Sequence, residues 1–157
     1  GVDAFLNKPF QSDQYLKEIA TLLNRELDSS TRLIFGADDS SLARTQLEKT
    51  LDREGFESRI FETGVEMLDA IKLADNENDQ RVPDVILSDL LMPGLDGIQI
   101  LETLRSMDPP RGEIPALIIS SYEKPEAIVI ALNAGANDFI TKPYVQNDVI
   151  ERIKIHL

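Results

Sequence analysis

Residues 84–97, Asp-Val-Ile-Leu-Ser-Asp-Leu-Leu-Met-Pro-Gly-Leu-Asp-Gly, join a short apolar run to an acidic residue and a stiff loop. The run Val85 to Leu87 is bounded by turn-forming residues, so we predict that it is a buried strand. Asp89 follows this run, and a proline and two glycines then delay the next helical pattern. Open α/β sheets bind their ligands at the carboxyl edge, which makes Asp89 a candidate for chemistry.

The composition of the 157-residue chain is that of a globular protein with one full domain and a short extra segment. No apolar run is long enough to span a membrane and no apolar leader opens the chain, so we expect a soluble, cytoplasmic protein without membrane contact. The chain has no cysteine, which excludes a thiolate metal site. Its net charge of −12 argues against direct contact with nucleic acid and is compatible with a divalent cation or a basic protein surface.

An internal repeat is present at a distance of one whole domain. Residues 1–10 recur as residues 135–144, and both copies contain a glycine, a phenylalanine and a Lys-Pro pair. The apolar pattern behind the repeat matches as well, which favours two copies of one domain over a chance match. We therefore expect residues 1–30 to be the last strand and helix of an upstream domain plus a polar linker, and residues 31–157 to be a complete domain.

The helix expected within residues 13–26 carries an apolar stripe. Leu16, Ile19 and Leu23 correspond to Ile150, Ile153 and Leu157 of the second copy. We expect this stripe to be buried against the complete domain or against a neighbouring chain.

Strands and helices alternate from Arg32 onward. Predicted strands cover residues 33–35, 56–61, 85–87, 116–119 and 139–140, and predicted helices begin near residues 41, 64, 98, 125 and 147. The buried faces of the first two helices are predicted to include Leu42, Leu47 and Leu51, and Val65, Leu68 and Ile71. This alternation predicts a doubly wound α/β fold with a five-stranded parallel sheet, strand order 2-1-3-4-5, and helices on both faces.

Polar side chains follow four of these strands and are expected to meet at one edge of the sheet. They are Asp38 and Asp39, Asp89, Ser120 and Lys142. Three converging carboxylates repel one another and favour a hard cation with oxygen ligands, for which Mg²⁺ is the natural choice. A hydroxyl and an ammonium nearby suit an incoming phosphoryl group, and one carboxylate can then act as its nucleophile.

The pattern resembles the CheY-like receiver domain of two-component response regulators. The resemblance covers residues 32–157 and rests on the acidic pair, on Asp89 with the Met-Pro-Gly-Leu-Asp-Gly that follows Leu91, on Ser120, and on Lys142-Pro143. It implies that Asp89 receives a phosphoryl group from a histidine kinase or a histidine phosphotransfer domain, with Ser120 and Lys142 assisting. The chain would then be a phosphoacceptor and not an enzyme, catalysing only its own phosphorylation and slow dephosphorylation.

The resemblance also implies the cofactor and the switch. Mg²⁺ would be held by Asp38, Asp39, Asp89 and the backbone carbonyl of Leu91. Ser120 and Phe139 would move on phosphorylation and reshape the face formed by the helix from Pro125, the last strand and the last helix. Leu91 and Tyr122 would flank the phosphoryl group. Our hypothesis is that they crowd the attacking water and so prolong the lifetime of the acyl phosphate; the alternative is that both side chains only shield the loop. The Lys142-Pro143 bond is expected to be cis.

The same resemblance makes residues 1–30 the remnant of a second receiver, and so predicts a multi-receiver protein with the receivers in tandem. Its output domain would lie in the same parent chain or in a partner protein, and a homodimer is compatible with this reading. The main alternative is a receiver-fold docking or dimerisation module with little or no phosphorylation. A haloacid-dehalogenase-like phosphatase would need a second acid where Leu91 stands, and a flavodoxin-type loop would be repelled by Asp38 and Asp39.

Overall fold

The computed structural model describes residues 16–19, 31–74, 81–92, 94–122 and 124–157. The chain divides into two compact units, residues 1–31 and residues 32–157. Residues 16–19 form a helical turn in which Leu16 is 61% exposed and Ile19 is half-buried. Burial of this stripe against a neighbouring chain stays a prediction, and Leu23 lies outside the described residues.

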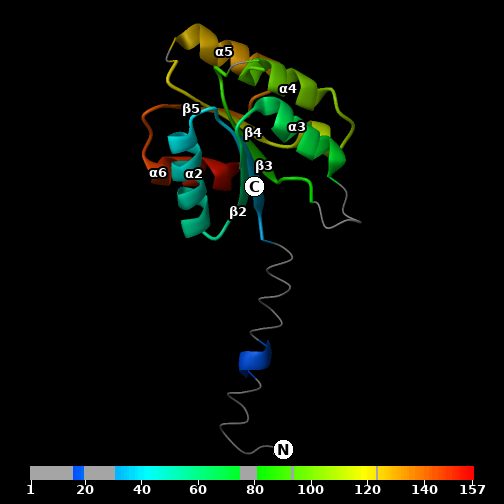
Figure 1. Cartoon of the computed structure of the whole chain (residues 1–157), viewed down its shortest axis with the longest axis vertical. Coiled ribbons are helices and arrows are strands. Elements are labelled where there is room, and N and C mark those ends of the chain that lie inside the picture. The colour runs from blue at the N-terminus through cyan, green and yellow to red at the C-terminus, as the bar shows by residue number, and fades with distance from the viewer. Residues whose placement is uncertain (1–15, 20–30, 75–80, 93, 123) are drawn as a thin grey trace, which may run out of the picture. The chain divides into compact units, whose positions relative to one another are not determined.

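The second unit is a parallel sheet of five strands in the order β2-β1-β3-β4-β5, with helices on both faces (Figure 1). This confirms the predicted fold class. The strands are β1 (Leu33–Ala37), β2 (Glu57–Phe61), β3 (Val85–Asp89), β4 (Ala116–Ser120) and β5 (Asp138–Thr141). The helices are α2 (Ser41–Arg53), α3 (Gly64–Leu73), α4 (Gly97–Arg105), α5 (Pro125–Ala134) and α6 (Gln146–His156), with a short 3₁₀ turn η2 (Arg111–Glu113).

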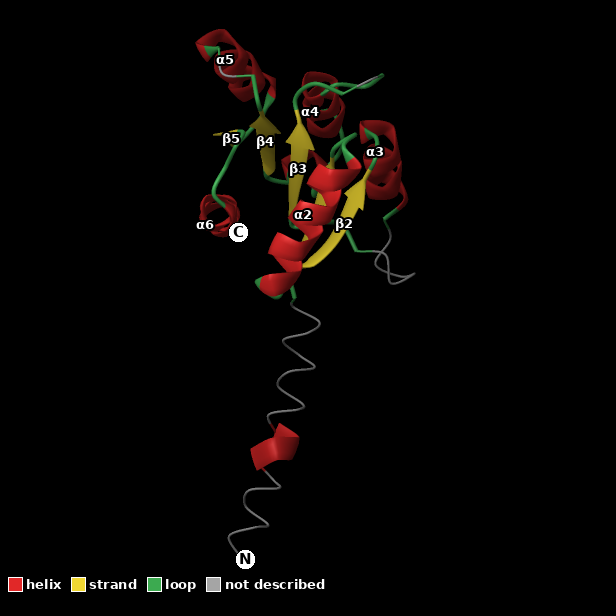
Figure 2. Cartoon of the chain, turned by 60° about the vertical axis from the view of Figure 1, so that its left-hand side comes forward, coloured by secondary structure: helices red, strands yellow, loops and turns green. Residues whose placement is uncertain are grey.

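The unit has three layers. Helices α3, α4 and α5 pack on one face of the sheet, and α2 and α6 pack on the other (Figure 2). Successive residues of a strand point to opposite faces, so the central strands supply both cores: Phe35 and Ile86 contact the first set of helices, and Ile34 and Leu87 the second. Among the described helices, none is long and apolar enough to cross a membrane.

Two helix faces differ from the prediction. Leu42 on α2 and Val65 on α3 are exposed, whereas Thr50 and Met67 are buried in their place. Neighbours on one helix face are three or four residues apart, and repeated steps of three drift around the helix. Leu42 lies five residues before Leu47, a spacing that puts it on another side of the helix. Val65 lies six residues before the buried Ile71, and this spacing also rotates it away from the buried face. Both side chains therefore point toward solvent.

The loop after β3 brings the site residues into position. Asp89 is the last residue of β3, not the residue beyond it, and Gly94 has a φ of +81°. The loop then returns against the strand, because the N–H of Gly97 donates to the carbonyl of Leu90. A Cβ on Gly97 would lie 2.7 Å from the Asp89 carbonyl oxygen, so this close approach requires glycine. Asp96 then caps α4 with a reciprocal bond to Gln99.

Candidate functional site

Three carboxylates converge at the carboxyl edge of the sheet, as the sequence predicts. Asp38 and Asp39 follow β1, and β1 pairs directly with β3 so that Ala37 lies opposite Ser88. This register places the residues after Ala37 beside Asp89. One carboxylate oxygen from each of Asp38, Asp39 and Asp89 lies within 4.8 Å of the other two. Asp38 is buried, Asp89 is partly buried and Asp39 is exposed, so the cluster opens to solvent on the Asp39 side.

The Lys142 side chain reaches the same edge from the far strand β5. Its Nζ lies 2.9 Å from Asp38 Oδ2 and 3.3 Å from Asp89 Oδ2. The backbone N–H of Lys142 donates to the Ser120 carbonyl at 2.7 Å, which continues the pairing of β4 with β5. The sheet thus fixes the lysine backbone, and its ammonium bridges two of the three carboxylates.

Burial and charge shift the protonation of these groups. Burial raises the pKa of the Asp89 carboxyl above its usual value, and Asp38 raises it further, although the ammonium of Lys142 opposes both effects. Burial alone would lower the pKa of Lys142, but its bonds and attraction to Asp38 and Asp89 outweigh burial and raise it. The ammonium therefore stays charged, while Asp89 is a carboxylate whose ionisation is costly without a further cation.

Two strand-end loops present backbone donors to the site. The N–H of Leu91 donates to Asp89 Oδ1 at 3.4 Å, and the N–H of Tyr122 donates to Ser120 Oγ at 3.1 Å. Ser120 is buried at the end of β4, one residue beyond the partner of Asp89 in the sheet register. The side chains of Leu91 and Tyr122 are exposed, and Phe139 is half-buried against the core under α3, α4 and α5.

Comparison with known proteins assigns the family. Residues 34–154 match the family described as the response regulator receiver domain. The chain belongs to this family. The receiver is 30% identical over 122 residues to the DNA-binding transcriptional regulator NtrC of Escherichia coli, covering 78% of this chain and 24% of that protein. It is 31% identical over 121 residues to the response regulator MprA of a Mycobacterium species, covering 77% of this chain and 48% of that protein. The chain thus spans less than half the length of these curated relatives.

Solved structures agree. The receiver domain of the Francisella response regulator 1452 superposes with a TM-score of 0.70 at 27% identity, covering 80% of this chain and 96% of that one. The signal receiver domain of a signal transduction histidine kinase from Syntrophus aciditrophicus gives a TM-score of 0.70 at 28% identity, covering 81% and 90%.

The acidic cluster of the receiver fits a magnesium ion. The donors are carboxylate oxygens only, they lie close enough together to share one ion, and one of them is open to solvent. Lys142 supplies a single positive charge against three negative ones, so a divalent cation would relieve the remaining repulsion.

Two receiver residues near the cluster escaped the sequence analysis. The Arg44 side chain donates to the Asp38 carbonyl at 2.8 Å, and the half-buried Tyr144 has a pKa raised by its burial. Arg44 stands one turn after the helix cap at Ser40, whose N–H donates to Asp38 Oδ1. A cation in the first turn of a helix is unfavourable for the helix dipole, and that is the signal that could have identified Arg44.

Proposed function

We propose that residues 31–157 form a phosphoacceptor receiver in which Asp89 takes a phosphoryl group from a histidine kinase or a histidine phosphotransfer domain. The observation that carries this proposal is the Lys142 ammonium lying between Asp38 and Asp89 at the edge where three carboxylates converge. A phosphoryl acceptor needs an ionised nucleophile, a fixed cation and a metal site in one place, and these residues supply all three.

In the transfer, a carboxylate oxygen of Asp89 attacks phosphorus, the N–P bond of the phosphohistidine breaks, and the O–P bond of an acyl phosphate forms. The Lys142 ammonium is placed to neutralise an oxygen of the transferred group, and the Ser120 hydroxyl can donate to another. Asp38, Asp39, Asp89 and the Leu91 carbonyl would hold Mg²⁺, which when bound neutralises the phosphoryl oxygens.

Phosphorylation would then act as a switch through Ser120 and Phe139. The Ser120 Oγ accepts the N–H of Tyr122, and its O–H can donate to an oxygen of a phosphoryl group on Asp89 if the side chain moves toward it. Phe139 is half-buried at the edge strand β5, so its inward movement would reshape the face formed by α5, β5 and α6. An output domain in the parent chain, a partner protein or a second copy of the receiver would bind this face.

The lifetime of the acyl phosphate would be set by the loops that flank it. Leu91 and Tyr122 each stand two residues after a site residue, and both expose an apolar side chain there. We infer that they hinder the approach of water to phosphorus and slow hydrolysis.

The wider context proposed here is a protein with receivers in tandem. The repeat of residues 1–10 at residues 135–144 supports the assignment of residues 1–30 as the remnant of a second receiver. In signalling, the chain would accept the phosphoryl group of a histidine kinase. It would catalyse only the phosphorylation of its own Asp89 and the slow dephosphorylation of that residue.

Intact-mass spectrometry with acetyl phosphate and Mg²⁺ tests the function. We expect one phosphoryl group per chain when Mg²⁺ is present, none when a chelator is added before the acetyl phosphate, and none in Asp89→Asn. Asp84→Asn is the matched control, because Asp84 lies at the other end of β3 and binds the N–H of Leu33, which an asparagine oxygen can also accept. Labelling of Asp84→Asn but not of Asp89→Asn supports the proposal. Unlabelled wild type would leave the docking or dimerisation module as the function.

A further inference from the structure

A mostly apolar groove lies between α4 and α5, beside the phosphoacceptor site. The two helices pack side by side on one face of the sheet, and each begins at the carboxyl edge (Figures 1 and 2). The groove has a volume of about 320 Å³. We call it the α4–α5 groove; its floor and apolar walls are formed by Leu90, Leu91, Ile98, Tyr122, Ala127 and Ile130.

Helix α5 turns three of its four large apolar residues outward, and the fourth, Ile128, is half-buried. Its buried positions are Ala127 and Ala131, whereas Val129, Ile130 and Leu132 are exposed. A helix of a monomeric domain normally buries its large apolar residues and exposes polar ones. On α5 the small residues are buried and the larger apolar residues are exposed beside the groove. Because exposed apolar surface of this kind is typical of interaction sites, we expect a partner to cover it.

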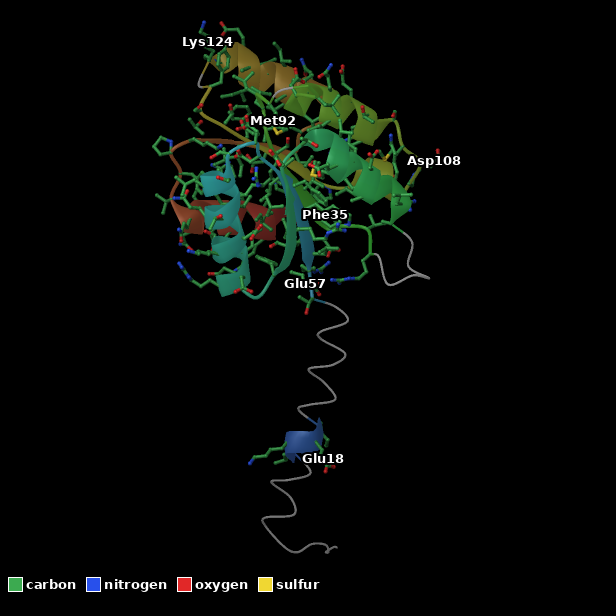
Figure 3. The ribbon with its side chains drawn as sticks, in the orientation of Figure 1. Glu18, Phe35, Glu57, Met92, Asp108 and Lys124 are labelled. Atoms are coloured by element: carbon green, nitrogen blue, oxygen red, sulfur yellow. The ribbon has the colours of Figure 1, made fainter. Side chains whose placement is uncertain are left out.

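The rim of the groove is acidic. Asp96 and Glu126 complete its lining, and Glu126 has neither an ion pair nor a hydrogen bond within the described part of the chain. A lysine, Lys124, lies at the start of α5 (Figure 3). Its Nζ is 5.8 Å from the centroid of the Tyr122 ring. A second copy would bring the same carboxylates against each other in a chain of net charge −12. The charge instead suits a partner that carries lysine or arginine beside an apolar anchor.

The walls of the groove are bonded to the phosphoacceptor site. Leu91 donates its N–H to Asp89, and Tyr122 donates its N–H to Ser120. Any movement of the Ser120 hydroxyl toward a phosphoryl group withdraws the acceptor that holds the Tyr122 wall. A ligand in the groove is therefore linked to the state of Asp89.

We propose that the α4–α5 groove docks a segment of a partner protein that presents an apolar side chain flanked by lysine or arginine, and that phosphorylation of Asp89 releases it. The docking part rests on the groove alone, whereas the release rests on the proposed function.

The docking test uses a short helical peptide with a leucine stripe flanked by lysines, and a twin peptide with glutamine in place of leucine. We expect the leucine peptide to shift the amide NMR signals of Leu91, Tyr122 and Ile130 in a saturable way, and the twin to bind about tenfold more weakly. Equal binding of the two peptides, or shifts spread over the whole acidic surface, would overturn the docking site.

Two pairs of variants locate the binding. Ile130 and Val129 are adjacent and both 54% exposed, but only Ile130 lines the groove. Ile130→Arg should weaken the binding of the leucine peptide about tenfold. Val129→Arg adds the same charge outside the groove and should leave the affinity unchanged. Glu126→Gln should weaken the binding of the leucine peptide about threefold, whereas Glu102→Gln on the exposed surface of α4 should not change it. Equal effects within either pair would contradict the assignment.

The release is tested on protein whose phosphorylation has been verified by mass. We expect the leucine peptide to bind the phosphorylated chain about fivefold more weakly than the unmodified chain, with Asp89→Asn insensitive to acetyl phosphate. Unchanged or tighter binding to the verified phosphoprotein would refute the release. If no phosphorylation occurs, the proposed function and the release fail together, while the peptide results on the unmodified chain still decide the docking site.

Discussion

At the amino edge of the sheet, the Arg105 guanidinium donates to the carbonyls of Gly112, Ile114 and Gly135 and to the side chain of Asn137. At the carboxyl edge, the Lys142 ammonium faces three carboxylates and contacts two of them. The cation at the amino edge meets neutral oxygens, and it ties the loops before β4 and β5 together. The cation at the carboxyl edge meets an excess of negative charge that it cannot balance.

The difference separates a structural use of charge from a chemical one. Arg111 follows the same rule as Arg105, because it donates to the carbonyls of Ile71 and Ala74 at the end of α3. These arginines stabilise loop conformations by satisfying backbone acceptors. At the carboxyl edge, the repulsion among the unbalanced carboxylates favours the binding of a divalent cation and lowers the stability of the fold without one.

Removal of the Arg105 side chain should destabilise the loops at the amino edge of the sheet and leave the residues at the carboxyl edge in place. Arg105→Ala deprives several half-buried acceptors of their donor, so the free energy of unfolding should fall by about 3 kcal/mol. Urea unfolding measures this, with Arg53→Ala as a control that removes one exposed bond to Gln146 and costs no more than about 0.5 kcal/mol. A loss as small as in the control would show that the amino edge is not held by Arg105.

Removal of Lys142 should disable the carboxyl edge. Lys142→Ala withdraws the fixed cation from Asp38 and Asp89, so the initial rate of labelling by acetyl phosphate should fall about 100-fold. Lys154→Ala is the control, since that exposed lysine lies on α6 and pairs with Glu54. A rate within about twofold of wild type would contradict the role given to Lys142.

Neutralisation of Asp89 should stabilise the fold when no metal is present. Because its pKa is raised, the folded chain binds this proton more tightly than the unfolded chain does. Stability therefore falls as pH rises from the ordinary value of 3.8 through the raised value, and the cost remains at neutral pH.

Asp89→Asn removes that cost, so its melting temperature at neutral pH should exceed that of wild type by a few degrees. In a domain of this size, this corresponds to a gain of about 1 kcal/mol in the free energy of unfolding. The gain should vanish below the ordinary carboxyl pKa and shrink when Mg²⁺ is added to wild type. Asp84→Asn, at the amino edge, should show no gain. An equal rise in melting temperature in the two variants would show that carboxylates at the two edges of the sheet have the same effect on stability.

The smallest effect concerns the apolar rim of the carboxyl edge. Leu91→Asn should shorten the lifetime of the phosphorylated chain about threefold, because a small polar side chain admits the attacking water. The decay of the phosphoprotein by mass spectrometry measures this, with the exposed Leu73 at the end of α3, changed to Asn, as control. Unchanged decay in Leu91→Asn would leave that side chain with a shielding role only.

Much of the fold could be predicted because periodicity and turn residues act locally. Strand runs, helix starts at Ser40 and Pro125, and the loop after Asp89 all follow from residues within one turn of each other. The errors at Leu42 and Val65 have the opposite cause. A helix rotates as a whole to place its best apolar stripe on the sheet, and single apolar residues outside that stripe are left in solvent.

The convergence of the charged side chains at one edge could be predicted, but their individual contacts could not. Asp89 ends a strand, Asp38, Asp39 and Lys142 follow one, and parallel strands bring such residues to one edge. Arg105 and the α4–α5 groove escaped prediction, since backbone carbonyls and the outward residues of α5 leave no periodic signal in the sequence. Arg44 was missed although its charge in the first turn of a helix is a local signal.

The sequence by itself determined the alternation of strands and helices, the residue types at each strand end, and the excess of acidic charge. The tertiary structure alone decided that the Lys142 ammonium bridges Asp38 and Asp89, that Arg105 ties the loops at the opposite edge, and that Ile130 faces a groove. The physical reason is range. Propensity and turn chemistry act between neighbours along the chain, whereas charge pairing and burial depend on distances that exist only after the sheet has formed.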